Sequence, residues 1–223
     1  MCGRYALTDL NALLKEDRFQ LKMFPPNLSP RYNIAPSQQV PAILNQAPRE
    51  LQLVRWGLIP SWAKDPAIGY RMINARAETI AEKPAFRRSL QRQRCLIPAD
   101  GFYEWQRVGT RKVPHWITLA SGEVFAFAGL WDSWTDPKTN TAVASCTIIT
   151  TNPNELLEPI HARMPVILPR EHEAMWLSDG LSPEQICAFL KPYPGEQMKA
   201  SPISMLVNSP NNDTPEVVQE VRD

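Results

Sequence analysis

The feature that most constrains the fold of this chain is its proline content. The 223 residues include 22 prolines and 9 glycines. Proline lacks a backbone N–H donor, so it ends helices and is confined to the edges and ends of strands. Because the prolines are scattered along the whole chain, the sequence predicts many short helices and strands joined by stiff loops, and no long helix.

Composition and length indicate one compact unit. Hydrophobic residues make up 43% of the chain and charged residues 21%, which is typical of a soluble globular protein. The length suits one good-sized core, so we expect a single domain over residues 1–223, with a peripheral tail from about residue 214. The sequence has no signal-like apolar start and no apolar run near the roughly 18 residues of a membrane span. We therefore expect a cytoplasmic protein with no membrane partner.

Short β-type runs alternate with helical patterns, without the regular spacing of a doubly wound sheet. This arrangement predicts an α+β fold with a mixed, mainly antiparallel sheet core and short peripheral helices. Strands are expected at 51–58, 113–119, 123–131 and 145–151. Helices are expected at 8–17 (capped by Thr8 or Asp9), 83–93, 154–161, 170–177 and 182–191 (capped by Ser182). Residues 24–41 are predicted to form a proline-rich loop.

The cysteines and the charges exclude several classes of protein. Cys2, Cys95, Cys146 and Cys187 lie far apart, without a C-x-x-C pair or zinc-type spacing, so we expect reduced thiols, no metal and no cofactor. The net charge of +1 argues against a uniformly basic nucleic-acid coat. Residues 71–94 are nevertheless locally +5; their basic members are Arg71, Arg76, Lys83, Arg87, Arg88, Arg92 and Arg94. That basic strip is either a solvated helix face or an anion-binding surface.

Polar residues within apolar stretches are the candidates for a site. In "MINARAET", an extended backbone would place Asn74, Arg76 and Glu78 on one face, although a solvent-facing edge strand explains them equally well. In "CLIPADGFYEW", Glu104 stands between Tyr103 and Trp105. Partial desolvation by these rings would raise its pKa and suit it to acid/base work, whereas a solvated strand residue is the simpler alternative.

Two other residue types extend this set. His161, in "LLEPIHARMPVIL", is the best-placed base among three histidines, although a capping role is as compatible with the sequence; His115 and His172 are interpreted as structural. Trp56 and Trp62 flank a glycine and a proline in "RWGLIPSW". One of these rings is expected to be exposed on a rigid loop, where it could stack an unpaired base.

Cys2 has a position with chemical meaning. Removal of Met1 leaves a cysteine whose amine (pKa about 8) and thiol (pKa about 8.5) sit on adjacent carbons. An aldehyde that meets this pair forms a Schiff base with the amine, and the thiol then closes a five-membered thiazolidine ring. That ring is more durable than the imine.

These pieces together resemble the SOS response-associated peptidase (SRAP) family of abasic-site processing proteins. The resemblance runs in order from residue 1 to about 168 and, more loosely, to about 213. It rests on "MCGRY", "RYNIAPSQ", "WGLIPSWAK", "INARAET", "CLIPADGFYEW", "FAGLWDSW", "TIITTNPN", "IHARMPVIL" and "VNSPNND".

The resemblance implies the SRAP fold and a monomer that binds abasic sites in single-stranded DNA and links to them covalently. Cys2 would be the nucleophile, Asn74 would hydrogen-bond the reacting centre, and Glu104 would be the acid/base that opens the sugar ring. His161 would assist proton transfer, mainly in reversal. The family name also implies that Met1 is removed by the protein itself.

The implied DNA contacts form a second set. Arg76 and Arg163 would hold the phosphates beside the lesion, and Arg4 is a further candidate. Pro36 and Trp62 would wedge or stack against the neighbouring bases.

Two other functions remain open at this point. Class II glutamine amidotransferases also begin with Met-Cys-Gly and use the cysteine as nucleophile, but the "MCGI" start and the Asn-Gly element expected for them are absent from this sequence. A non-covalent single-stranded DNA-binding module, in which Cys2 is incidental, is the other alternative.

Overall fold

The structure of the protein is a computed structural model that describes residues 2–15 and 18–221. The strands are β1 (Tyr5–Leu7), β2 (Arg31–Ile34), β3 (Gln39–Leu44), β4 (Leu51–Trp56), β5 (Asn74–Arg76), β6 (Arg94–Ala99), β7 (Gly101–Val108), β8 (Arg111–Leu119), β9 (Phe125–Thr135), β10 (Ala142–Thr151), β11 (Met164–Pro165), β12 (Ile167–Leu168) and β13 (Met198–Pro202). The α-helices are α1 (Leu10–Lys15), α2 (Pro84–Arg92), α3 (Arg170–Leu177) and α4 (Pro183–Ala188). The 3-10 helices are η1 (Pro66–Arg71), η2 (Gly195–Gln197), η3 (Met205–Asn208) and η4 (Pro215–Val218).

The strands form two sheets. A 5-stranded sheet has the order β13-β8-β7-β1-β2, and an 8-stranded sheet has the order β11-β10-β4-β3-β6-β9-β12, with β5 added beside β10. Because β10 also pairs with β9, the larger sheet closes on itself as a barrel. The strands of this core are mostly antiparallel, and β10 pairs in parallel with β4 and β5. The α+β fold with a mixed, mainly antiparallel core is therefore confirmed.

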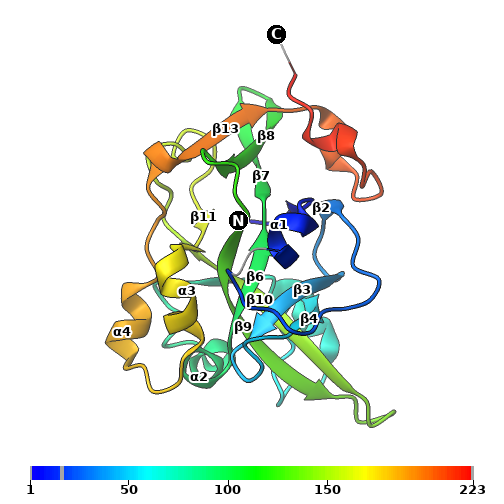
Figure 1. Ribbon diagram of the computed structural model, residues 1–223, viewed down its shortest axis with the longest axis vertical. Helices are drawn as coiled ribbons and strands as arrows, with labels where there is room; N and C mark the ends of the chain where they lie inside the picture. Colours follow the sequence, from blue (N-terminus) through cyan, green and yellow to red (C-terminus); the bar gives the residue numbers. More distant parts are fainter. Residues whose placement is uncertain (1, 16–17, 222–223) are drawn as a thin grey trace.

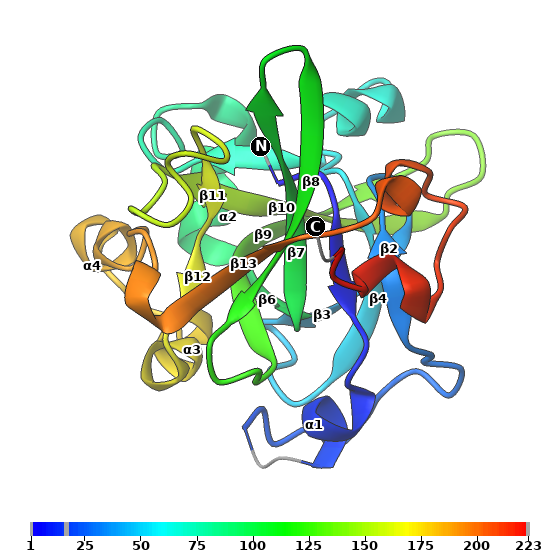
Figure 2. The same cartoon turned by 90° about the horizontal axis from the view of Figure 1, so that it is seen from above.

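Short helices surround this core. Figure 1 shows β7, β8 and β13 in the upper part of the molecule, with α2, α3 and α4 around the lower left. Seen from above in Figure 2, the β7–β8 hairpin projects past the other strands on the side opposite α1. Within the described residues, no helix is long and apolar enough to cross a membrane.

The predicted caps of two helices are confirmed. The Asp9 carboxylate accepts from the Ala12 amide at 2.9 Å, so Asp9 satisfies a free donor of the first turn of α1. Ser182 and Gln185 form a capping box at the start of α4, which satisfies two amides reciprocally. In both helices, hydrogen bonds between residues three apart in the sequence determine where the helix begins.

Two of the predicted segments are wrong. Residues 154–161 form turns rather than a helix, because Pro159 has no N–H to continue the ladder and the Asn154 side chain instead accepts from the Leu157 amide at 3.0 Å. The predicted loop 24–41 contains β2 and the first half of β3. Pro41 lies inside β3, and Pro36 lies in the turn before it. The prolines of this stretch therefore influence where the strands begin and end but do not prevent the strands from forming.

The C-terminal stretch is packed rather than extended. Val217 in η4 is fully buried, and Ile203 makes an isolated bridge with Glu220. Residues 214–221 therefore contribute apolar contacts to the upper sheet.

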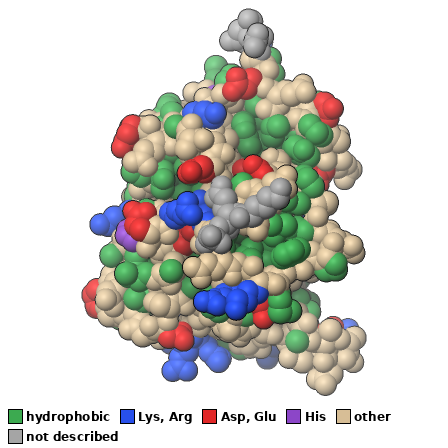
Figure 3. Space-filling view, viewed as in Figure 1, with side chains coloured by type: hydrophobic (Ala, Val, Ile, Leu, Met, Phe, Trp, Pro, Cys, Tyr) green, Lys and Arg blue, Asp and Glu red, His purple; other side chains and the backbone are tan. Residues whose placement is uncertain are grey.

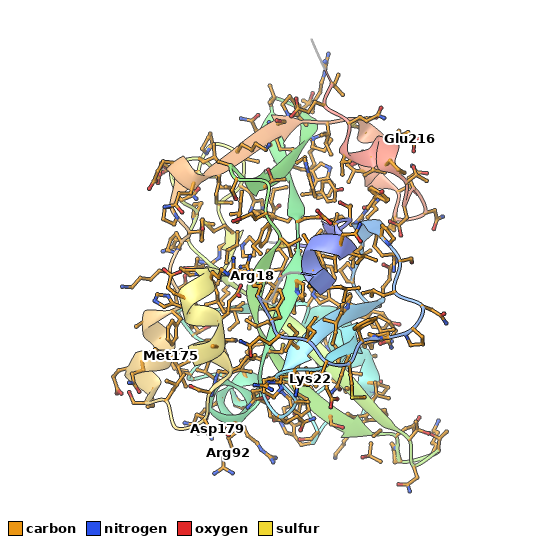
Figure 4. The ribbon with its side chains drawn as sticks, viewed as in Figure 1. Arg18, Lys22, Arg92, Met175, Asp179 and Glu216 are labelled. Atoms are coloured by element: carbon orange, nitrogen blue, oxygen red, sulfur yellow. The ribbon has the colours of Figure 1, made fainter. Side chains whose placement is uncertain are left out.

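The basic strip divides into exposed and buried members. Arg87, Arg88 and Arg92 are exposed on α2, and basic side chains gather at the lower end of the molecule in Figure 3, where Figure 4 shows Arg92 projecting away from the body. Arg94 is instead fully buried. Its guanidinium donates to four carbonyl oxygens, those of Leu90, Gln91, Trp176 and Ser178. Arg94 thus belongs to the core and joins the ends of α2 and α3.

We expect Arg94→Met to lower the free energy of unfolding by about 3 kcal/mol, because buried carbonyls lose charged donors that no other group replaces. Arg92→Met, two residues earlier and exposed, is the matched control and should change it by less than about 0.5 kcal/mol. Urea denaturation followed by fluorescence measures both. Equal midpoints for the two variants would contradict the anchoring role of Arg94.

Candidate active site

Cys2 is held beside β7 by the pairing of β1. In that antiparallel pair Tyr5 lies opposite Phe102, and the Tyr103 amide donates to the Arg4 carbonyl at 3.0 Å. Continuing this register toward the N-terminus places Gly3 level with Glu104 and Cys2 one residue beyond, close enough for the Glu104 charge to act on the Cys2 thiol. The cysteine is fully buried, and its Sγ lies 4.0 Å from the Arg4 carbonyl oxygen. Burial, and then the charge of Glu104, raise the pKa of the Cys2 thiol.

Glu104 is a buried carboxyl group. Its exposed fraction is 3%, although a solvated strand residue was the simpler interpretation of the sequence. Burial raises the pKa of Glu104 to about 7. Near neutral pH this group therefore exists in both protonation states, as an acid/base catalyst requires.

His161 is brought next to Glu104 by the turns that follow β10. Its Nδ1 lies 3.8 Å from Glu104 Oε1, and Gln106, also on β7, donates to the Pro159 carbonyl at 3.2 Å. The Arg163 amide donates to His161 Nδ1 at 3.1 Å, and the Arg163 carbonyl oxygen is also 3.1 Å from that nitrogen. Nδ1 thus has a backbone partner whether or not it carries a proton. Burial lowers the pKa of His161, so the imidazole is neutral at pH 7.

Arg163 is fixed by acceptors from three segments. Its guanidinium binds Glu78 through two N–H···O bonds of 2.8 and 2.9 Å. It also donates to the Thr150 carbonyl at 2.7 Å and to Asn152 Oδ1 at 3.1 Å. The hydrogen bond from Arg163 lowers the pKa of Glu78. Arg163 is therefore a rigid cation whose exposed edge is shared with a carboxylate.

Asn74 and Arg76 lie on β5, which pairs in parallel with β10. Asn74 lies level with Ile148 and Arg76 with Thr150. Ala75 between them is buried while Arg76 is exposed, so Asn74 and Arg76 share a face as predicted. Among the described residues no group pairs with the buried Asn74 Oδ1, which leaves this acceptor available to a ligand.

The remaining predicted residues lie outside this cluster. Arg4 turns away and donates to Asn33 Oδ1 and to the Val207 carbonyl, both at 2.7 Å, so its described contacts are internal. Pro36 lies in the turn before β3, next to Ser37, which has a φ of 73°. Trp62 is 60% exposed whereas Trp56 is buried, which identifies Trp62 as the expected exposed ring.

Two contributors were not predicted by pattern. Glu78 was recognised only as a strand neighbour, but it lies beyond the end of β5 and neutralises Arg163. Gln106 fastens the His161 segment, and its position two residues after Glu104 on the same face of β7 is the signal that would have found it.

Together these groups can move protons at a buried nucleophile. A thiol, a carboxyl group with a pKa of about 7 and a neutral imidazole come from the segment before β1, from β7 and from the segment before β11. Exposed Arg76 lies on β5, and the Arg163–Glu78 pair joins the residue before β11 to the turn after β5. The arrangement suits covalent chemistry on an anionic, carbonyl-bearing substrate.

Comparison with known proteins points to one family. The model of the family described as "SOS response associated peptidase (SRAP)" matches residues 1–210. The abasic site processing protein YoqW of Bacillus subtilis (strain 168) is 48% identical over 225 residues, covering 98% of this chain and 99% of its own. The abasic site processing protein HMCES of Xenopus tropicalis is 33% identical over 223 residues, covering 86% of this chain and 66% of its own.

Solved structures show the same fold. A crystal structure of a protein from Bacteroides thetaiotaomicron matches with a TM-score of 0.89 and 32% identity, covering 99% of this chain and all of the other (100%). A protein from Bordetella bronchiseptica matches with a TM-score of 0.79 and 28% identity, covering 92% of this chain.

Proposed function

Because the chain belongs to the SOS response-associated peptidase (SRAP) family, we propose that it processes abasic sites, by linking Cys2 covalently to the exposed sugar aldehyde in single-stranded DNA. The observation that carries the proposal is the cluster of Cys2, Glu104 and His161. Relatives of this chain are named abasic site processing proteins, which supports DNA as the substrate. The protein acts on its DNA as a monomer.

The reaction begins once Met1 has been removed. In the self-catalysed route, the Cys2 thiol attacks the Met1 carbonyl, and the amide nitrogen leaves as the α-amine, taking the thiol proton. Water then hydrolyses the thioester and releases methionine. The product carries the free amine and the free thiol that the next step requires.

Glu104 and His161 transfer protons during the reaction of the abasic sugar. Protonated Glu104 donates to the ring oxygen as the abasic deoxyribose opens to its aldehyde, and the anomeric hydroxyl releases its proton to water. The Cys2 amine adds to the aldehyde carbon and water leaves, which gives an imine. The thiol then adds to the imine carbon and its proton moves to the nitrogen, closing the thiazolidine. Asn74 hydrogen-bonds the reacting centre through its unpaired Oδ1, and His161 shuttles protons when the link reverses.

Ring closure protects the strand. An aldehyde, or an imine in equilibrium with it, permits β-elimination of the neighbouring phosphate. Thiol addition makes the carbon tetrahedral and removes the activation of the adjacent C–H. The proposed activity therefore shields the lesion.

DNA recognition in this proposal depends on the backbone, since an abasic site offers no base to read. Arg76 is exposed beside Asn74 and contacts one phosphate. Arg163 contacts the next, exchanging part of its pairing with Glu78 for a phosphate oxygen, which has the same bidentate geometry. Pro36 and Trp62 contact the bases on either side of the lesion. Arg4 stabilises the N-terminal segment that carries Cys2.

The decisive experiment is a denaturing gel. Protein lacking Met1 is mixed with single-stranded DNA that contains one abasic site, and the mixture is then heated in detergent. A retarded band that requires the lesion supports the proposal. Glutaminase activity with no DNA adduct would favour an amidotransferase instead, and binding that salt alone removes would favour a non-covalent module.

We expect Arg76→Ala to weaken binding to intact single-stranded DNA and to reduce the slope of log Kd against log salt by about 0.7, the contribution of one phosphate contact on a single strand. Arg92→Ala, which removes an exposed cation of α2, is the control and should leave the slope unchanged. Fluorescence anisotropy over a salt series measures both. An unaltered slope for Arg76→Ala would exclude a phosphate contact.

A further inference from the structure

Arg55 is a half-buried cation that the proposed chemistry does not use. It lies on β4, and its side chain forms no hydrogen bond or ion pair with any residue in the described ranges. Its Nε is inaccessible to solvent. Burying part of a guanidinium without a carboxylate partner costs free energy. Such a group is suited to bind an anion supplied by a ligand.

Tyr70 covers this arginine. The Arg55 guanidinium carbon lies 5.2 Å from the centre of the Tyr70 ring, within the range of a cation–π contact. The tyrosine is nevertheless 63% exposed, since the guanidinium contacts only one part of it. A large, solvent-exposed aromatic surface next to a cation therefore remains available.

The backbone presents Tyr70 rigidly. Asp65 caps η1 by accepting from the Ala67 amide at 2.9 Å, and Gly69 packs against Gly57 at the end of β4. A side chain on Gly57 would come within 2.6 Å of the Gly69 carbonyl oxygen, and the φ of Gly57 is 127°. Only glycine allows this approach, so η1 is clamped to the strand that carries Arg55.

A hollow of about 410 Å³ adjoins the ring. Its wall includes two exposed aromatics, Trp62 and Tyr70, and its charged members are Lys64, Arg71 and Asp65. With Arg55 at its border, the surroundings are net positive. Aromatic faces between cations are the elements with which proteins hold unpaired nucleotides irrespective of sequence.

The position of Arg55 relates the hollow to the candidate active site. Arg55 lies level with Ser145 of β10, and Asn74 lies level with Ile148 on the same edge of that strand. Three residues of strand correspond to about 10 Å. Because Ser145 and Ile148 are three residues apart on an unbroken strand, Arg55 and Asn74 point to opposite faces of the sheet. A DNA strand seated at Asn74 must therefore cross the edge of the sheet to reach Arg55.

We propose that Arg55 and Tyr70 form a nucleotide subsite, in which the Tyr70 ring stacks an unpaired base from the strand that carries the lesion and Arg55 binds the adjoining phosphate. This inference rests on the proposed function for the identity of the strand. It adds a second anchor, separate from the aldehyde, that lengthens the footprint on single-stranded DNA.

The test measures affinity for intact oligothymidylates of increasing length by anisotropy, so that no covalent step contributes. Tyr70→Ala should weaken binding roughly tenfold for a 12-mer, and much less for a trimer. Tyr70→Phe should bind like the wild type because the stacking face is retained. Phe24→Ala, which removes another exposed aromatic (51% exposed) outside the hollow, should also be unchanged.

Arg55→Gln should lower the salt slope by about 0.7 on the 12-mer, with thermal unfolding as the check on folding. Equal 12-mer affinity for wild type and Tyr70→Ala would overturn the subsite, whether or not abasic DNA is cross-linked. Conversely, loss of cross-linking in the wild type with a preserved Tyr70 effect would remove the proposed function and leave the subsite standing.

Discussion

Replacing Cys2 by alanine should abolish the adduct with abasic DNA, while non-covalent affinity for intact single-stranded DNA should stay within about twofold of the wild type. The variant has no thiol with which to remove Met1, so it is prepared without that residue. Its α-amine can then still form an imine, but no thiol is present to close the ring. The remaining imine hydrolyses on heating. Gel retardation after heating measures the adduct, and anisotropy measures the affinity.

A second treatment distinguishes imine from thiazolidine. Borohydride reduces an imine to a stable amine, so it should restore a heat-resistant band for Cys2→Ala. The Cys187→Ala variant, which removes the exposed cysteine, is the matched control and should cross-link normally. A heat-stable adduct of Cys2→Ala without borohydride would contradict the thiazolidine.

Replacing Glu104 by glutamine should slow adduct formation by about 10² to 10⁴, the usual contribution of a positioned acid/base group. Glutamine preserves size and hydrogen bonding but cannot transfer a proton. Burial places the pKa of Glu104 at about 7, so its acid form is lost as the pH rises through 7. The Cys2 amine, with a pKa of about 8, becomes reactive over the next unit.

The wild-type rate should therefore follow a bell-shaped pH profile, and Glu104→Gln should keep only the limb that rises with the amine. Single-turnover rates between pH 5.5 and 9 measure this difference. A Glu104→Gln enzyme that still shows a falling limb near pH 7, or that reacts at the wild-type rate, would remove the acid role. His161→Gln provides a comparison, since its main effect is expected on reversal.

The same carboxyl group has a linked effect on stability. The folded protein binds the Glu104 proton more tightly than the unfolded chain, whose carboxyl has an ordinary pKa of about 4.5. The stability that the folded protein gains by binding this proton more tightly is therefore fully present below pH 4.5, and it is lost as the pH rises to 7. Glu104→Gln should accordingly unfold at a higher temperature than the wild type at pH 8, and the difference should shrink at pH 5.

Local hydrogen bonding explains which parts of the fold were predictable. The Ser182 capping box and the Asp9 cap involve partners three residues away, so the sequence displays both halves of each interaction. The segment 154–161 has helix-like apolar spacing, but Pro159 lacks the N–H that a helix would need there. Arg94 looks like a surface cation by composition, whereas its acceptors come from two helix ends that only the tertiary fold brings together.

The candidate site divides in the same way. Cys2, Glu104 and His161 were marked as candidates by position or by apolar neighbours, but simpler alternatives stayed open for Glu104 and His161, and only the family resemblance joined the three into one site. The pairing of Arg163 with Glu78 spans 85 residues, and no local pattern encodes it. The Arg55–Tyr70 contact likewise depends on how η1 folds against β4, and the sequence alone presents only a scattered arginine and tyrosine.

The pairing of β1 also determines when the surroundings of Cys2 are assembled. Cys2 is made before its neighbours on β7, because Tyr5 pairs with Phe102 and synthesis proceeds from the N-terminus. Until β7 has emerged and docked, Cys2 lacks both Glu104 and its burial. The environment that raises the pKa of the Cys2 thiol is therefore acquired only after β7 has been made.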